Sequence, residues 1–268
     1  MSLQRSSIVL ASFLACFSLF TAGPVLSQTG TISGTIHLTG TPRPNPLIRM
    51  GADPNCLRIN AGKRVFAEIV TRSSDGGLGN VFVHVSSAPK SSGSGTVLLD
   101  QKGCMYHPTI IAAQVGQTLE VRNDDSTLHN IHAVDPSKKY TFDQAQPSAG
   151  MVLSVPLKYD EVMLHVKCNI HPWMTGYIGI VNDPFYAVSD DTGKFTIKNV
   201  PAGKQTIEVW HEVYGPLTQT VDVKAGGTTN VDFTYTGNEH PSPSASLPIQ
   251  EITIPAGANT VTFASPGQ

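Results

Sequence analysis

The chain has 268 residues, of which only 14% are charged, and its formal net charge is −2. A weakly acidic chain of this kind has no electrostatic attraction for nucleic acid or for an acidic surface, so we expect no nucleic-acid partner. The 24 glycines and 19 prolines, together with the lack of sustained helical periodicity, favour an all-β protein.

Residues 1–27 are typical of an export signal. Arg5 precedes an apolar run over residues 8–20, and small residues lead up to Ser27. The run is short for a membrane span, and no other stretch is long and apolar enough, so we expect a periplasmic or secreted chain that begins near Gln28 and has no membrane span after signal removal. A lipoprotein anchor at Cys16 is the less favoured alternative, because this cysteine lies inside the apolar run.

The next segment predicts strands at residues 29–40, 65–70 and 81–85, each alternating and bounded by turn residues. We expect them to extend the domain that follows, so that residues 28–185 form one unit. A small separate domain over residues 28–95 is the alternative.

From residue 96 onward, short apolar runs at 97–99, 109–115 and 118–121 alternate with turn residues. Short strands at this spacing are typical of a sandwich of two β-sheets.

A Cys-x-x-His-x-x-Met loop follows the alternating run at residues 163–168 and contains Cys168, His171 and Met174. Strand parity places Cys168 on the same inward face as Leu164 and Val166. Blue copper sites use one Cys sulfur, two His nitrogens and a weak axial Met, so the loop provides three of the four ligands. Zinc is a poorer match, because a thioether is a weak ligand for it.

The fourth ligand is predicted at His129, which comes soon after the strand expected at 118–122. His132 is the competing candidate. If residues 128–133 are extended, His129 and Ile131 share one face and His132 points to the other, which favours His129.

These motifs resemble the cupredoxins, the family of plastocyanin, pseudoazurin and especially amicyanin, over about residues 95–185. The resemblance implies a Greek-key β-sandwich with one type 1 copper ion per chain, held by His129, Cys168, His171 and Met174. It also implies that the backbone N–H of Asn130 points toward the copper-bound sulfur.

Of the four cysteines, Cys16 falls in the signal, and with Cys168 on copper only Cys56 and Cys104 are left. In an oxidising compartment we expect these two to form a disulfide. The competing hypothesis makes Cys104 and His107 half of a second metal site.

Residues 186–236 contain further alternating runs separated by tight turns such as Asp190–Gly193. This segment resembles the carboxypeptidase regulatory-like, transthyretin-like β-sandwich module, which implies a structural role without catalysis. Residues 237–268 are predicted to be a polar linker and a tail, with a possible hairpin at 251–254 and 260–263.

The sequence therefore favours an electron-transfer protein rather than an enzyme. Electrons would pass through an exposed edge of His171 to an unidentified redox partner protein, with Pro172 and Trp173 as an apolar docking rim. A copper oxidase or nitrite reductase would need a second copper site, and no His-x-His motif occurs. Two further hypotheses are a copper carrier or buffer, for which Met-rich or His-rich tracts would be expected, and a purely structural β-sandwich protein.

Overall fold

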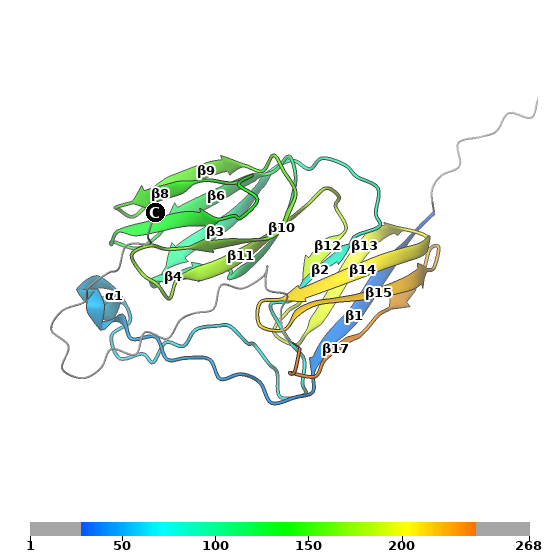
Figure 1. Cartoon of the computed structure of the whole chain (residues 1–268), viewed down its shortest axis with the longest axis horizontal. Helices are drawn as coiled ribbons and strands as arrows, with labels where there is room; N and C mark the ends of the chain where they lie inside the picture. Colours follow the sequence, from blue (N-terminus) through cyan, green and yellow to red (C-terminus); the bar gives the residue numbers. More distant parts are fainter. Residues whose placement is uncertain (1–27, 240–268) are drawn as a thin grey trace, which may run out of the picture.

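Short strands with alternating buried and exposed side chains form the framework of residues 28–239, the part of the chain that the structure, a computed structural model, describes. The strands form two β-sandwiches, which lie side by side in Figure 1. The predicted all-β class is confirmed. The expected signal at 1–27 and the possible hairpin at 251–263 lie outside the described residues.

The first sandwich consists of two sheets around a single apolar core. One sheet has the order β4 (Met105–His107), β3 (Thr96–Lys102), β6 (Thr118–Asn123) and β9 (Val152–Pro156). The other has the order β5 (Ile110–Gln114), β11 (Thr175–Val181), β10 (Glu161–Lys167), β7 (His129–Val134) and β8 (Asp143–Gln146). Strand β10 pairs with both β7 and β11, so the predicted ligands lie at the ends of neighbouring strands.

The second sandwich combines strands from both ends of the chain. One sheet contains β13 (Lys194–Pro201), β1 (Thr29–Leu38), β16 (Thr228–Asn230) and β17 (Phe233–Tyr235). The other has the order β12 (Tyr186–Val188), β2 (Phe82–Val85), β14 (Gly203–His211) and β15 (Gly215–Val223). Figure 1 shows β1, in blue, among the yellow and orange strands.

The expectation that residues 28–94 add strands to the first sandwich is therefore wrong for β1 and β2. Strand β1 is antiparallel to β13 and buries Ile32 and Ile36 in the second core. Its Gly34 has no room for a side chain, because an added Cβ would lie 1.8 Å from the carbonyl oxygen of Val231. Alternation along the chain identifies a strand but does not identify a partner more than 160 residues away.

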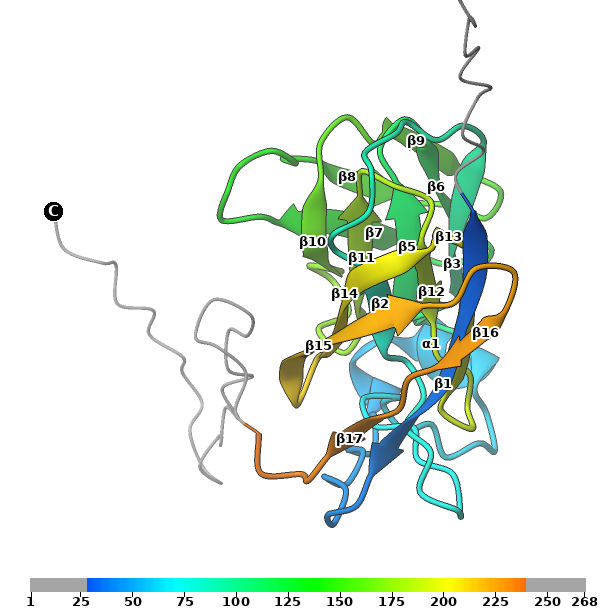
Figure 2. The ribbon, with the colours of Figure 1, turned by 90° about the vertical axis from the view of Figure 1, so that its right-hand side faces the viewer.

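Between β1 and β2 the chain crosses to one end of the first sandwich (Figures 1 and 2). There it forms the short helices η1 (Met50–Ala52) and α1 (Pro54–Ile59), with Asp53 as the N-cap of α1. The predicted strand at 65–70 is wrong, because the structure has only a single bridge there, between Leu47 and Phe66. Within residues 28–239, no helix combines the length and apolar character needed to cross a membrane.

The two sandwiches meet through a small apolar cluster that includes Phe82, Ile110 and Trp210. The ring of Tyr177 on β11 lies 4.9 Å from that of Trp210 on β14. Gly179 permits this packing, since an added Cβ would lie 2.5 Å from the Phe82 ring. Both sandwiches thus share buried surface, although each has its own core.

His211 is a core residue of the second sandwich rather than part of a solvated edge. Its side chain is fully buried and stacks on Tyr214 at 4.9 Å, and its Nδ1 accepts a hydrogen bond from the Val213 N–H. Burial lowers the pKa of His211 to about 3.

The unfolded chain therefore binds a proton at His211 below about pH 6.5, and the folded chain does not until about pH 3. We expect this residue to lower the free energy of unfolding by about 2 kcal/mol between pH 7 and pH 5. Urea unfolding of His211→Phe, which keeps a stacking ring, should lack this part of the pH dependence, so the difference in unfolding free energy between the two proteins should change by about 2 kcal/mol between pH 7 and pH 5. An identical pH slope in both proteins would contradict the prediction.

Candidate metal centre

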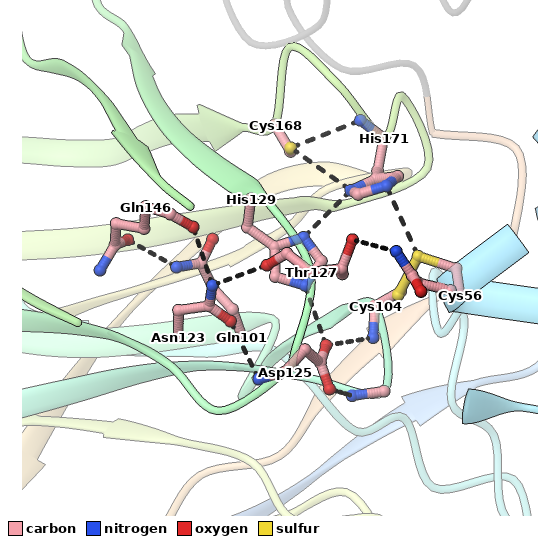
Figure 3. Close-up of polar contacts among 12 residues, drawn as sticks. Cys56, Gln101, Cys104, Asn123, Asp125, Thr127, His129, Gln146, Cys168 and His171 are labelled. Atoms are coloured by element: carbon pink, nitrogen blue, oxygen red, sulfur yellow. Dashed lines mark hydrogen bonds and ion pairs between the residues drawn. A yellow bond between two sulfur atoms is a disulfide. The ribbon is translucent and has the colours of Figure 1, made fainter. Parts of the chain in front are cut away.

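The side chains of His129, Cys168 and His171 converge in the interior of the first sandwich (Figure 3). The Nδ1 atoms of the two rings are 3.0 Å apart, and the Cys168 sulfur is 3.8 Å from Nδ1 of His171. All three side chains are buried. One nitrogen from each ring and one sulfur thus face a common point.

Backbone hydrogen bonds hold the loop between β10 and β11 closed. The Cys168 N–H donates to the carbonyl of Met174, and the Met174 N–H donates to the carbonyl of His171. The His171 N–H also lies 3.4 Å from the Cys168 sulfur. Met174 is fully buried in the first core, so its thioether lies on the protein side of the loop rather than in solvent.

The loop that leads into His129 is fixed by buried amide side chains. Asn123 donates to the carbonyls of Thr127 and Gln146, and the Gln101 amide donates to Oε1 of Gln146 (Figure 3). The Asn123 side-chain oxygen also accepts from the Asp125 N–H. Buried networks of this kind fix a single arrangement, and here they determine how His129 enters β7.

A carboxylate binds the outer nitrogen of each ring. Oδ2 of Asp125 lies 2.9 Å from Nε2 of His129, and Oδ2 of Asp53 lies 2.9 Å from Nε2 of His171. Hydrogen bonding by His171 lowers the pKa of Asp53. Burial raises the pKa of Asp125, but the hydrogen bonds from His129 and from the Cys104 and Gly103 N–H groups together outweigh this effect and lower the pKa. Ionised carboxylates only accept hydrogen bonds, so both rings carry a proton on Nε2.

The two Nδ1 atoms consequently need a positive charge between them. At 3.0 Å there is room for one shared proton at most. Burial raises the pKa of Cys168, but hydrogen bonds with His129 and His171 outweigh this and lower it to about 6. Burial lowers the pKa of His129, and its hydrogen bonds with Asp125 and Cys168 raise it above the usual value. A thiolate and two imidazole nitrogens around one point fit a soft or borderline metal cation.

Cys56 and Cys104 form a disulfide, as predicted. The competing hypothesis, a second metal site with Cys104 and His107, is excluded because Cys104 is not a free thiol and His107 is exposed. The Cys56 sulfur lies 3.5 Å from Nε2 of His171. Each cysteine also contacts one of the two carboxylates through its backbone, since the Cys56 N–H donates to Asp53 and the Cys104 N–H donates to Asp125.

The expected exposed edge of His171 is wrong, because its side chain is only 1% exposed. Asp53 and the disulfide cover its outer nitrogen. Of the predicted docking rim, Pro172 is exposed, whereas Trp173 is half-buried and donates from Nε1 to the carbonyl of Cys104. The Trp173 ring lies 5.1 Å from that of His171. This tryptophan therefore packs against the site as well as bordering it.

Neighbours of the predicted ligands also have defined positions. The side-chain oxygen of Asn130 accepts from the Asn169 N–H, and its amide donates to Asp143, which attaches β7 to the Cys168 loop. His132 is half-buried and contacts the side chain of Asn169 at 3.0 Å, outside the group formed by His129, Cys168 and His171.

The sequence prediction did not identify the two carboxylates. Asp125 precedes His129 by four residues, which is a weak local signal, but acidic residues in loops are common. Asp53 is separated from His171 by 118 residues, and only its place before Pro54, as a helix N-cap, could be read from the chain. Its contact with His171 depends on the tertiary fold.

Comparison with known protein families supports the prediction for the C-terminal segment. A family model for the carboxypeptidase regulatory-like domain matches residues 180–236, which confirms the resemblance of the C-terminal segment. No curated protein matches the chain.

The solved structures to which this chain is similar include cupredoxins, the family that the sequence resembles. They include a purple cupredoxin from Nitrosopumilus maritimus (22% identity, 31% of this chain, 98% of that chain, TM-score 0.28) and a reduced tryptophan-to-tyrosine mutant of amicyanin (18%, 37%, 97%, 0.29). The Cu-containing nitrite reductase (NirK) from Thermus scotoductus SA-01 is similar at 21% identity, over 32% of this chain and 22% of that chain, with a TM-score of 0.30. This chain thus spans about a fifth of the reductase.

Proposed function

We propose that the chain is an exported type 1 copper protein that passes single electrons and catalyses no reaction on a substrate. His129, Cys168 and His171 would hold the ion, with Met174 as the weak axial ligand. Copper in such a site cycles between Cu(I) and Cu(II). The observation that carries the proposal is the convergence of two Nδ1 atoms and one buried thiolate on a point, with both Nε2 atoms already bound by carboxylates.

The protein's own groups favour a fixed geometry. Carboxylates orient each imidazole and keep its proton on Nε2, so that Nδ1 is free to bind a metal. The short loop from Cys168 to Met174 is closed by backbone hydrogen bonds and lies between two paired strands. Ligands held this way need little rearrangement when the charge of the centre changes.

The proposal includes location and partner. The apolar run at residues 8–20 and the Cys56–Cys104 disulfide both suit the periplasm or the cell exterior. The second sandwich would serve as a structural or attachment module, and the electrons would be exchanged with a redox partner protein.

Titration of the purified mature protein with Cu(II) tests this function. We expect one equivalent to give an intense visible charge-transfer band and an EPR spectrum with narrow hyperfine splitting, and Cys168→Ser to abolish both. His132→Ala is the matched control, since this ring lies outside the ligand group, and it should keep the colour. A colourless protein that binds zinc as well as copper would disprove the proposal.

Met174→Gln tests the axial position separately. We expect the variant to bind copper and stay coloured but to have a lower reduction potential, because the axial ligand adjusts the potential of such sites. Redox titration followed by visible absorption measures it. An unchanged potential would argue that Met174 is only a core residue.

A further inference from the structure

A loop over residues 46–67, here called the cap, closes over the metal centre. Hydrogen bonds from the Ala67 N–H to Pro46 and from the Ile48 N–H to Val65 join its two ends. Its interior is attached to the first sandwich by the disulfide and by the amide of Asn60, which donates to the carbonyl of Gly103. Figures 1 and 2 show α1, the helix of the cap, at the end of that sandwich.

Among the described residues, those that contact Nε2 of His171 belong to the cap, so the cap separates this nitrogen from solvent. Asp53 contacts this nitrogen at 2.9 Å, and its own side chain is 20% exposed. Leu57, one residue after the Cys56 that lies 3.5 Å from the same nitrogen, is 56% exposed. A partner bound on the cap would thus be separated from His171 by about one side chain.

The charge of the cap is opposite to that of the rest of the chain. Its basic residues, all exposed, are Arg49, Arg58, Lys63 and Arg64. Its only acidic residue is Asp53, which is bound to His171. The whole chain has 18 basic and 20 acidic residues, so the remainder has 14 basic and 19 acidic ones. The cap therefore has a net charge of +3 on a remainder of −5.

Apolar side chains lie among these cations. Leu47, Leu57 and Phe66 are between 40% and 56% exposed, and Leu47 pairs with Phe66 across the base of the cap. The Arg64 guanidinium lies 5.5 Å from the centre of the Phe66 ring. A surface of exposed apolar groups surrounded by charges of one sign suits brief, electrostatically steered contacts between proteins.

We propose that the outer face of the cap is the docking surface for an acidic redox partner protein. This docking proposal rests on the proposed electron-transfer function. It adds that the partner is acidic and that the electron passes through the cap instead of through an exposed edge of His171. The positive cap raises the encounter rate with an acidic surface although the whole chain is weakly acidic. Leu57 and Phe66 supply the apolar contact.

The first test uses the metal-free protein and hexacyanochromate(III), a paramagnetic anion that does not react. We expect it to broaden the NMR amide signals of the cap, and we expect Arg58→Glu with Lys63→Glu to remove the broadening. The matched control is Lys198→Glu with Lys204→Glu, the same charge change at two exposed lysines of the second sandwich, which should leave it intact. Broadening centred elsewhere, or equal in both variants, would overturn the proposal.

The second test measures the transfer itself in the copper-loaded, reduced protein. One electron leaves the protein and converts hexacyanoferrate(III) to hexacyanoferrate(II). We expect the cap variant to slow this step by about tenfold at low salt, and the control variant to leave it nearly unchanged. Poly-L-glutamate, a carboxylate-rich chain, should compete with hexacyanoferrate(III) for the wild-type protein and for the control variant. It should not compete for the cap variant.

The two tests separate the docking surface from the proposed function. A protein that binds no copper while the cap still collects hexacyanochromate(III) would overturn the function and leave the cap as an anion-binding surface. If the protein is blue but the cap variant and the control variant change the rate of hexacyanoferrate(III) reduction equally, the proposed function stands and the docking surface is overturned. Thiol titration confirms that the disulfide is intact in each variant, and the milder Arg58→Gln with Lys63→Gln should give an intermediate loss of rate.

Discussion

Replacing both Cys56 and Cys104 with alanine is expected to lower the free energy of unfolding by about 4 kcal/mol. The disulfide closes a loop with a sequence separation of 48, and the chain-entropy model gives that value for a loop of this length. For a chain of this size the loss corresponds to a fall in melting temperature of about 8 to 16 °C. Urea unfolding measures the difference between the chains with and without the disulfide. Both chains carry Cys168→Ser, so that the free thiol cannot exchange with the disulfide. A change below about 1 kcal/mol would contradict the prediction.

The same double variant should also weaken metal binding. The two cysteines lie in the loops that hold the carboxylates, with the Cys56 N–H bound to Asp53 and the Cys104 N–H bound to Asp125. Without the covalent link, the cap can separate from the sandwich and remove Asp53 from His171. Ile197→Ala is a matched control in the second core, expected to cost about 2 to 5 kcal/mol and to leave copper affinity unchanged. Copper affinity is measured by competition with a chelator in variants that retain Cys168. Comparing the double cysteine variant with Ile197→Ala separates a loss of stability from a loss of the metal site.

Local patterns were sufficient to predict that His129, Cys168 and His171 lie together, and tertiary contacts account for what was missed. Cys168, His171 and Met174 recur at a fixed spacing within seven residues, and strand parity selects His129 over His132. The disulfide followed from counting cysteines.

The cap and the composition of the second sandwich could not be obtained in this way. The cap consists of the two short helices η1 and α1, of three and six residues, and of irregular chain, so no periodicity predicts it. Its position depends on Cys56, Asp53 and buried Met50. Strand β1 alternates as a strand should, but its partners β13 and β16 lie near the other end of the chain. The hypothesis of an exposed His171 failed for the same reason, since no local pattern places Asp53 and the disulfide over its outer nitrogen.

Asp125→Asn is expected to reduce copper affinity by about 10- to 100-fold, the usual effect of removing a hydrogen-bonding partner of a metal ligand. Asp125 is 5% exposed and accepts three hydrogen bonds, from the Gly103 N–H at 2.8 Å, the Cys104 N–H at 2.7 Å and Nε2 of His129 at 2.9 Å. An amide has a single accepting oxygen, so its NH₂ group replaces either Oδ1, which faces the Gly103 N–H, or Oδ2, which faces the Cys104 N–H and Nε2 of His129. His129 then loses the carboxylate that keeps its proton on Nε2 and Nδ1 free for the metal.

Stability should fall in the same variant, by about 1 to 3 kcal/mol for each buried donor left without a partner. Asp124→Asn is the matched control one residue earlier, where the carboxylate contacts Arg122 near the surface and such a pair contributes about 0 to 1 kcal/mol. Chelator competition and urea unfolding measure both quantities on both variants. If Asp125→Asn behaves like Asp124→Asn in copper affinity, then Asp125 stabilises the loop around Cys104 without orienting His129, and the part of the proposed function that relies on carboxylate-fixed imidazoles is wrong.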